Sequence, residues 1–64
     1  MSTTLEQAAY SAGWMCVMSG ADPRYCNPFD RKAMPKSNYA WDHGALDAME
    51  AEDGEEPDPK SAGY

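Results

Sequence analysis

Positively charged residues are scarce in this chain of 64 residues, which has 5 Lys and Arg against 11 Asp and Glu and a net charge of −6. Residues 41–59 contain acidic side chains but no Lys or Arg. This balance argues against uniform nucleic-acid binding, because phosphate contacts depend on cations. Residues 21–36 differ: they hold Arg24, Arg31, Lys32 and Lys36 against two Asp. The chain thus has a mildly basic middle and an acidic end.

Long hydrophobic runs and a cysteine framework are also lacking. The apolar stretch over residues 8–18 is interrupted by Ser11 and Gly13, and it is shorter than the roughly 20 residues of a membrane span. The N-terminus lacks the basic region of a secretory signal. The 2 cysteines do not form a disulfide framework. We expect no membrane attachment and a cytoplasmic location with free thiols.

Signatures of catalysis and metal binding are equally sparse. So short a chain leaves little room for the pocket of roughly 300 Å³ or more that small-molecule sites use, and no Gly-rich phosphate loop is present. Cys16, Cys26 and His43 are the only soft or borderline ligands, and their wide spacing fits zinc sites poorly. Nothing in the sequence pairs Cys26 with His43 for catalysis. The sequence therefore predicts no enzyme, metal, cofactor or small-molecule substrate.

What the chain does contain is a strong signal for a helix over about residues 4–19. The pair Thr4 and Gln7, or the pair one residue earlier, fits a capping box. Gly20 suits the left-handed position beyond the helix end. Almost nothing between residues 8 and 18 is polar, so this helix must be buried on more than one side. One short partner helix cannot cover it, and a further binding surface is expected.

A second helix is predicted over about residues 38–52, after a structured loop that is rich in proline and aromatic residues. Each proline lacks an amide donor and disfavours helix at the preceding residue. Ser37 is the expected N-cap of the second helix. Gly44 in this helix and Gly13 in the first favour a close helix crossing, although both glycines could simply be tolerated.

The end of the chain, residues 54–64, is acidic and rich in Pro and Gly. It cannot bury enough apolar surface to offset the entropy lost on ordering. The sequence therefore predicts an all-α fold, with one helical-hairpin domain over residues 1–53 and a disordered acidic tail over residues 54–64.

Three short motifs occur in an order that resembles the ribosome modulation factor family. They are AYSAG in the first helix, CNPF in the loop and WDHGALDAM in the second helix. The matching positions are Tyr10, Ala12, Gly13, Cys26, Asn27, Pro28, Phe29, Trp41, Gly44 and Ala48. The resemblance implies a small two-helix protein of bacterial or mobile-element type that binds the ribosome and is not an enzyme.

The leading hypothesis is a non-enzymatic regulator of translation that binds the ribosome or its rRNA, with cations on phosphate and aromatic rings stacked on bases. Founding members of the family are basic, whereas this chain is acidic. The alternative is a phage- or plasmid-type inhibitor or adaptor that binds a host protein through an apolar helix and an acidic surface. A homodimer would also cover the first helix. The expected partner-binding residues are Tyr10, Trp14, Arg24, Tyr25, Phe29, Arg31, Lys32, Lys36 and Trp41.

Overall fold

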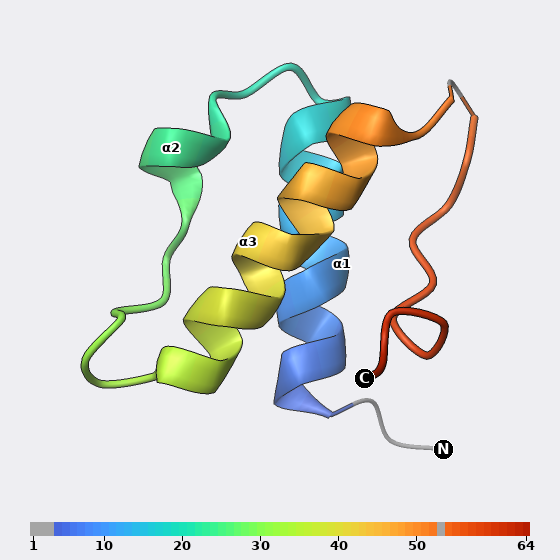
Figure 1. Ribbon diagram of the computed structural model, residues 1–64. Coiled ribbons are helices and arrows are strands. Elements are labelled where there is room, and N and C mark those ends of the chain that lie inside the picture. Colours follow the sequence, from blue (N-terminus) through green and yellow to red (C-terminus); the bar gives the residue numbers. More distant parts are fainter. Residues whose placement is uncertain (1–3, 53) are drawn as a thin grey trace.

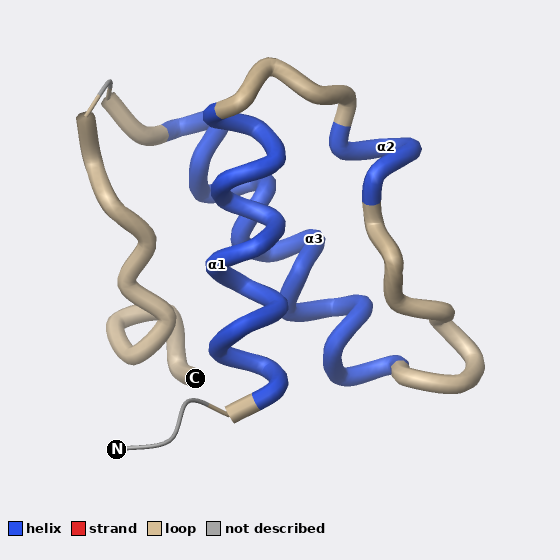
Figure 2. The backbone as a smooth tube through the Cα atoms, turned by 180° about the vertical axis from the view of Figure 1, so that it is seen from behind, coloured by secondary structure: helices blue, strands red, loops and turns tan. Residues whose placement is uncertain are grey.

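The computed structural model describes residues 4–52 and 54–64, and within these residues it contains helices but no strand. The helices are α1 (Leu5–Met18), α2 (Pro23–Cys26) and α3 (Pro35–Glu50). Helices α1 and α3 cross as a hairpin, with the segment that carries α2 on one side and the C-terminal segment on the other (Figure 1). Figure 2 shows the same arrangement from behind. The predicted all-α hairpin is confirmed, while the expected domain boundary at residue 53 lies outside the described residues.

Helix α1 begins at the predicted capping box. The amide of Gln7 donates to the Thr4 hydroxyl at 3.1 Å, and the amide of Thr4 donates to the Gln7 side chain at 3.1 Å. These two bonds satisfy backbone donors that the first turn of a helix leaves unpaired. The alternative cap at Thr3 lies outside the described residues.

The other end of α1 is closed by a backbone turn at Gly20, whose φ is +88°. The Gly20 amide donates to the Val17 carbonyl at 3.0 Å, and the Ala21 amide donates to the Cys16 carbonyl at 3.1 Å. This pair of bonds is the Schellman arrangement, in which glycine adopts the left-handed conformation at low cost. The chain thereby reverses over the last turn of α1, and α2 then contacts α1.

Helices α1 and α3 approach each other most closely at two glycines. A Cβ atom on Gly13 would overlap the carbonyl oxygen of Trp41, and a Cβ atom on Gly44 would overlap the carbonyl oxygen of Tyr10. The two helices therefore touch backbone to backbone at both positions. The close crossing that the glycines indicated is confirmed, and neither glycine is merely tolerated.

Large aromatic side chains supply most of the core around this crossing. Tyr10, Trp14 and Trp41 are buried, together with Ala9, Ala40, Ala45 and Ala48. All three aromatic residues were expected to bind a partner, but the structure places them in the core instead. Because glycine and alanine contribute little apolar area at the crossing, the tyrosine and the two tryptophans fill the space between the helices instead.

Helix α3 differs from the prediction at both ends, since it begins at Pro35 and ends at Glu50. Proline is compatible with the first helical position, where its missing amide donor would be unpaired anyway. Ser37 is therefore not the N-cap: it lies inside the first turn and is buried. The N-cap is Met34, whose side chain makes no capping hydrogen bond.

The single-turn helix α2 was predicted to be part of the loop. Asp22 caps it by accepting a hydrogen bond from the Arg24 amide at 3.0 Å, and Pro23 occupies its start. Asp followed by Pro is a helix-start signal in the sequence, whereas the predicted loop rested only on the prolines as helix breakers.

Residues 54–64 also differ from the prediction, because this segment packs back onto α1 and α3 instead of being disordered (Figure 1). Gln7 Nε2 donates to the backbone oxygen of Tyr64 at 2.8 Å, and the Tyr64 hydroxyl lies 3.1 Å from His43 Nδ1. The Tyr64 ring lies 5.6 Å from the ring of Tyr10. Tyr64 thus holds residues 54–64 against both helices, although the composition of this segment is typical of disorder.

A polar cluster lies beneath this segment. The Tyr10 hydroxyl donates to Asp47 Oδ2, which is also 3.4 Å from His43 Nε2. Burial of the Tyr10 side chain raises its pKa well above the ordinary value of 10.0, and the hydrogen bond to Asp47 and the charge of Asp47 raise it further. Burial, followed by the charges of nearby Tyr39 and Asp47, raises the pKa of Tyr64 in the same direction.

The raised pKa of Tyr10 predicts that the folded state loses stability at alkaline pH. Above pH 10.0 the unfolded tyrosine releases its proton while the folded one retains it, so the folded state binds more protons and the free energy of unfolding falls as pH rises. One such group costs at most about 1.4 kcal/mol per pH unit. Urea titrations followed by circular dichroism should show this decline. In the Tyr10→Phe variant, only the part of the decline that is due to Tyr64 should remain. Identical pH dependence in the variant and the wild type would contradict the assignment.

Candidate functional site

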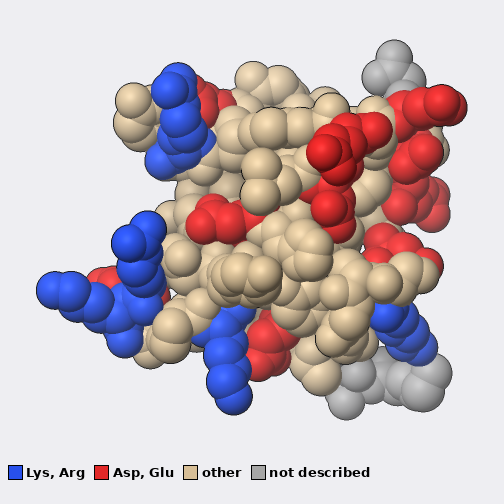
Figure 3. Space-filling view, viewed as in Figure 1, with Lys and Arg blue, Asp and Glu red and all other residues tan. Residues whose placement is uncertain are grey.

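Positively charged side chains gather mainly on one side of the molecule, with a few acidic side chains beside them (Figure 3). Most of the Lys and Arg side chains lie on the side of α2 and its loop, whereas many Asp and Glu side chains lie over the end of α3 and the C-terminal segment (Figure 3). We call the surface formed by Arg24, Tyr25, Arg31 and Lys32 the cationic edge. The basic middle of the sequence is thus a distinct surface of the fold, turned away from most of the acidic residues.

The cationic edge is held to α3 by hydrogen bonds from the CNPF motif. Asn27 Nδ2 donates to the carbonyl of Asn38 and to Asp42 Oδ1, both at 3.1 Å. Asn27 Oδ1 accepts from the Phe29 amide at 2.9 Å, and Asn38 Nδ2 donates to the Phe29 carbonyl at 2.7 Å. The Phe29 side chain is half-buried and packs against the core. We use the name clasp for the four residues that make these hydrogen bonds, Asn27, Phe29, Asn38 and Asp42. Their bonds fix the loop on both sides of Pro28.

Two features distinguish the α2 end of the cationic edge. Arg24 Nη2 lies 2.9 Å from Asp22 Oδ2, and hydrogen bonds from Arg24 lower the pKa of the Asp22 carboxyl. The Arg24 guanidinium also lies over the ring of Tyr25, 5.6 Å from its centroid. Tyr25 is 82% exposed, so the outer face of the edge presents an aromatic ring backed by a cation.

Within the described residues, the cations at the loop end of the cationic edge lack an acidic partner of the kind that Arg24 has in Asp22. Asp30 accepts a hydrogen bond from the Lys32 amide at 2.7 Å, which shapes the turn. Within residues 4–52 and 54–64, neither Arg31 nor Lys32 forms an ion pair. Both side chains are exposed and are therefore the strongest candidates for contact with an anionic partner.

A groove of about 580 Å³ separates this edge from α3. Arg24 and Arg31 contribute to its lining, and so do Leu46 and Met49 of α3, both of which are exposed. Asp42 also lines the groove, which therefore combines apolar side chains with charged side chains of both signs. Neither Leu46 nor Met49 was among the expected partner-binding residues.

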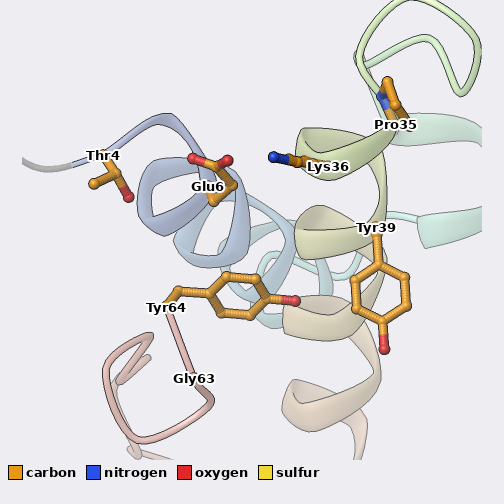
Figure 4. Close-up of a pocket in the computed structure, with 7 residues that line it drawn as sticks. All are labelled: Thr4, Glu6, Pro35, Lys36, Tyr39, Gly63 and Tyr64. Carbon is orange, nitrogen blue, oxygen red and sulfur yellow. The ribbon is translucent and has the colours of Figure 1, made fainter.

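A second groove, of about 550 Å³, lies where the first turns of α1 and α3 meet the C-terminal segment. Lys36 lines it with Glu6, Tyr39 and Tyr64 (Figure 4). Lys36 therefore lines another groove than Arg24 and Arg31. Both grooves are larger than the chain length led us to expect, because they form on the surface between the hairpin and its flanking segments.

The described residues contain no group of three or more His, Cys, Asp and Glu side chains that could hold a metal ion. In the same part of the chain, no helix combines the length and hydrophobicity needed to cross a membrane. His43 contacts Tyr64 and Asp47, while Cys16 is a half-buried free thiol and Cys26 an exposed one.

The predicted site residues thus separate into three groups. Arg24, Tyr25, Arg31, Lys32 and Lys36 are exposed, Phe29 is half-buried, and Tyr10, Trp14 and Trp41 lie in the core. Among the expected motif residues, Gly13, Gly44 and Ala48 are buried between the helices, Asn27 belongs to the clasp, and Cys26 and Pro28 are exposed.

Comparisons with protein-family models, with curated proteins and with solved structures gave no match to this chain. The resemblance to the ribosome modulation factor family therefore rests on the three sequence motifs alone.

Proposed function

We propose that this chain is a non-enzymatic regulator that binds the ribosome through the cationic edge. The observation that supports this proposal is the separation of charge: Arg31 and Lys32 are exposed beside Tyr25, while many of the acidic residues lie across the molecule. Exposed cations contact phosphate, and an exposed aromatic ring stacks on an unpaired base. A chain with a net charge of −6 can then present one face to RNA.

The clasp supports this proposal because it limits the motion of the loop that carries the cations. Hydrogen bonds fix the loop at Asn27 and Phe29, directly before Arg31. A loop that is ordered before binding loses less conformational entropy on association. The acidic side would remain exposed in the complex and would orient the chain, since it repels phosphate.

Sedimentation of a lysate through a sucrose gradient tests the proposal. At low salt the wild-type chain should travel with ribosomal particles, and Lys32→Glu should shift it toward the top of the gradient. The matched control is Lys60→Glu, which changes the net charge equally but lies in the C-terminal segment. The slope of the log binding constant against the log salt concentration should also become smaller, by about one for each phosphate contact that is removed.

Two outcomes would count against ribosome binding. One is that the wild-type chain stays at the top of the gradient at low salt, and the other is that Lys32→Glu and Lys60→Glu weaken binding equally. The second candidate function, a host-protein inhibitor or adaptor, would then be favoured. The groove supports this alternative, because Leu46 and Met49 are exposed beside Arg24 and Arg31 and suit an amphipathic protein segment.

A further inference from the structure

One face of α1 is not covered by the described part of the chain. Leu5, Ala8, Ala12 and Met15 are exposed and follow one another at intervals of three or four residues, and Met18 continues the row. Side chains at this spacing share one face of a helix. Leu5 is 50% exposed and Met15 is 58% exposed. Contiguous exposed apolar surface, unlike single scattered residues, marks an interaction site.

The last turns of this face border a groove of about 480 Å³ between α1 and the C-terminal segment. Met15 and Met18 line the groove from α1, and residues 54–57 line it from the C-terminal segment. Methionine side chains are flexible and adapt to the shape of whatever packs on them. We call this site the methionine groove. It combines apolar side chains of α1 with the acidic side chains of Glu55 and Glu56.

The methionine groove lies in an acidic region of the molecule. Glu55 and Glu56 are exposed, and within residues 4–52 and 54–64 neither of them forms an ion pair. Residues 1–23 and 41–59 contain no Lys or Arg, and Lys60 is not among the residues that line the groove. Acidic side chains gather over the end of α3 and the C-terminal segment (Figure 3). Such a surface attracts cationic partners.

We propose that the methionine groove binds a basic amphipathic segment of a partner protein. Apolar side chains of that segment would pack on Met15 and Met18, and its Lys or Arg side chains would lie against Glu55 and Glu56. Recognition of this kind combines apolar anchors with complementary charge. The groove is built from α1 and the C-terminal segment, so the proposal does not depend on the cationic edge or on ribosome binding.

A second copy of this chain fits the same face poorly. In a symmetric dimer each copy would bring its own Glu55 and Glu56 to the interface, and each copy carries a net charge of −6. Helix α1 contains Glu6 but no Lys or Arg that could meet those acids. Like charges that face each other across an interface weaken association. Charge complementarity therefore favours a basic partner over the homodimer that the sequence left open.

Fluorescence anisotropy with the full-length chain and labelled synthetic peptides tests the proposal. The probe is a helical peptide of Leu and Lys whose Leu side chains all lie on one face. One control peptide has the same composition in scrambled order, and the other has Glu in place of Lys. We expect the probe to bind at least about tenfold more tightly than either control, because only the probe offers both an apolar face and cations.

Matched variants of the chain locate the binding site. Met18 and Met34 are both 37% exposed, but only Met18 lines the methionine groove. Met18→Gln should weaken binding of the probe about tenfold, whereas Met34→Gln should leave it unchanged. Glu56→Gln should weaken binding about two- to fivefold, whereas Glu6→Gln, in the first turn of α1, should have no effect. Circular dichroism should show that all four variants retain the helical fold.

Three results would overturn the proposal. The first is that either control peptide binds as tightly as the probe, and the second is that Met18→Gln and Met34→Gln have equal effects. The third is that analytical ultracentrifugation finds a wild-type dimer that Met18→Gln dissociates, which would assign this face to a second copy. The test of ribosome binding depends on Lys32 instead, so either proposal can fail while the other holds.

Discussion

Replacing Gly44 by alanine is expected to destabilise the fold by about 3 kcal/mol or to prevent it from forming. The added Cβ atom would overlap the Tyr10 carbonyl oxygen and would lie 2.8 Å from the Tyr10 carbonyl carbon. Backbone atoms cannot move aside as a flexible side chain can, so α1 and α3 must separate. Alanine favours helix over glycine by only about 1 kcal/mol, which is too little to offset that separation.

The thermal and urea unfolding of Gly44→Ala should be compared with that of Gly20→Ala. A Cβ atom on Gly20 would meet nothing within 4 Å, but its φ of +88° is strained for alanine. That strain costs roughly 1–2 kcal/mol and involves no helix contact. Gly13→Ala, at the matching position of α1, should behave like Gly44→Ala. A Gly44→Ala chain as stable as the wild type would refute the close crossing.

The second large effect is expected for Trp41→Ala, which should lower the free energy of unfolding by about 3–5 kcal/mol. Trp41 is 2% exposed and lies with Tyr10 and Trp14 between the helices, so its removal leaves a cavity and reduces apolar burial. A single core in a chain of this length rarely supplies more than about 3–5 kcal/mol of stability. The variant should therefore be partly or fully unfolded at room temperature.

Tyr39→Ala is the matched control, because this aromatic residue is in the same helix but is 68% exposed. It should lower the free energy of unfolding by less than about 1 kcal/mol. Circular dichroism during urea titration measures both losses without relying on tryptophan fluorescence. If the two variants were equally stable, Trp41 would not be a core residue and its assignment to a binding surface would need to be restored.

The three buried aromatic residues show where reasoning from the sequence reached its limit. Because helix α1 is apolar nearly all round, the sequence predicts that a partner or a second copy of the chain covers it. The structure covers part of that helix with the C-terminal segment, whose Tyr64 packs beside Tyr10. Leu5, Met15 and Met18 nevertheless remain exposed on α1. The sequence identified the excess of apolar residues correctly but could not tell which of them the rest of the chain would cover.

The features that were predicted correctly depend on near neighbours or on the size of a side chain. The Thr4–Gln7 cap and the turn at Gly20 involve residues within one or two helical turns, so their spacing is visible in the sequence. The crossing at Gly13 and Gly44 follows from the absence of a side chain in a helix, where glycine needs a reason.

Tertiary structure alone decided the features that join distant residues. The Asn27 contact with Asp42 and the Tyr64 contact with His43 each depend on how the chain returns to the hairpin. The same applies to the cations, because the fold places Lys36 in another groove than Arg24 and Arg31. Such contacts depend on the direction and packing of whole elements, which local spacing does not encode.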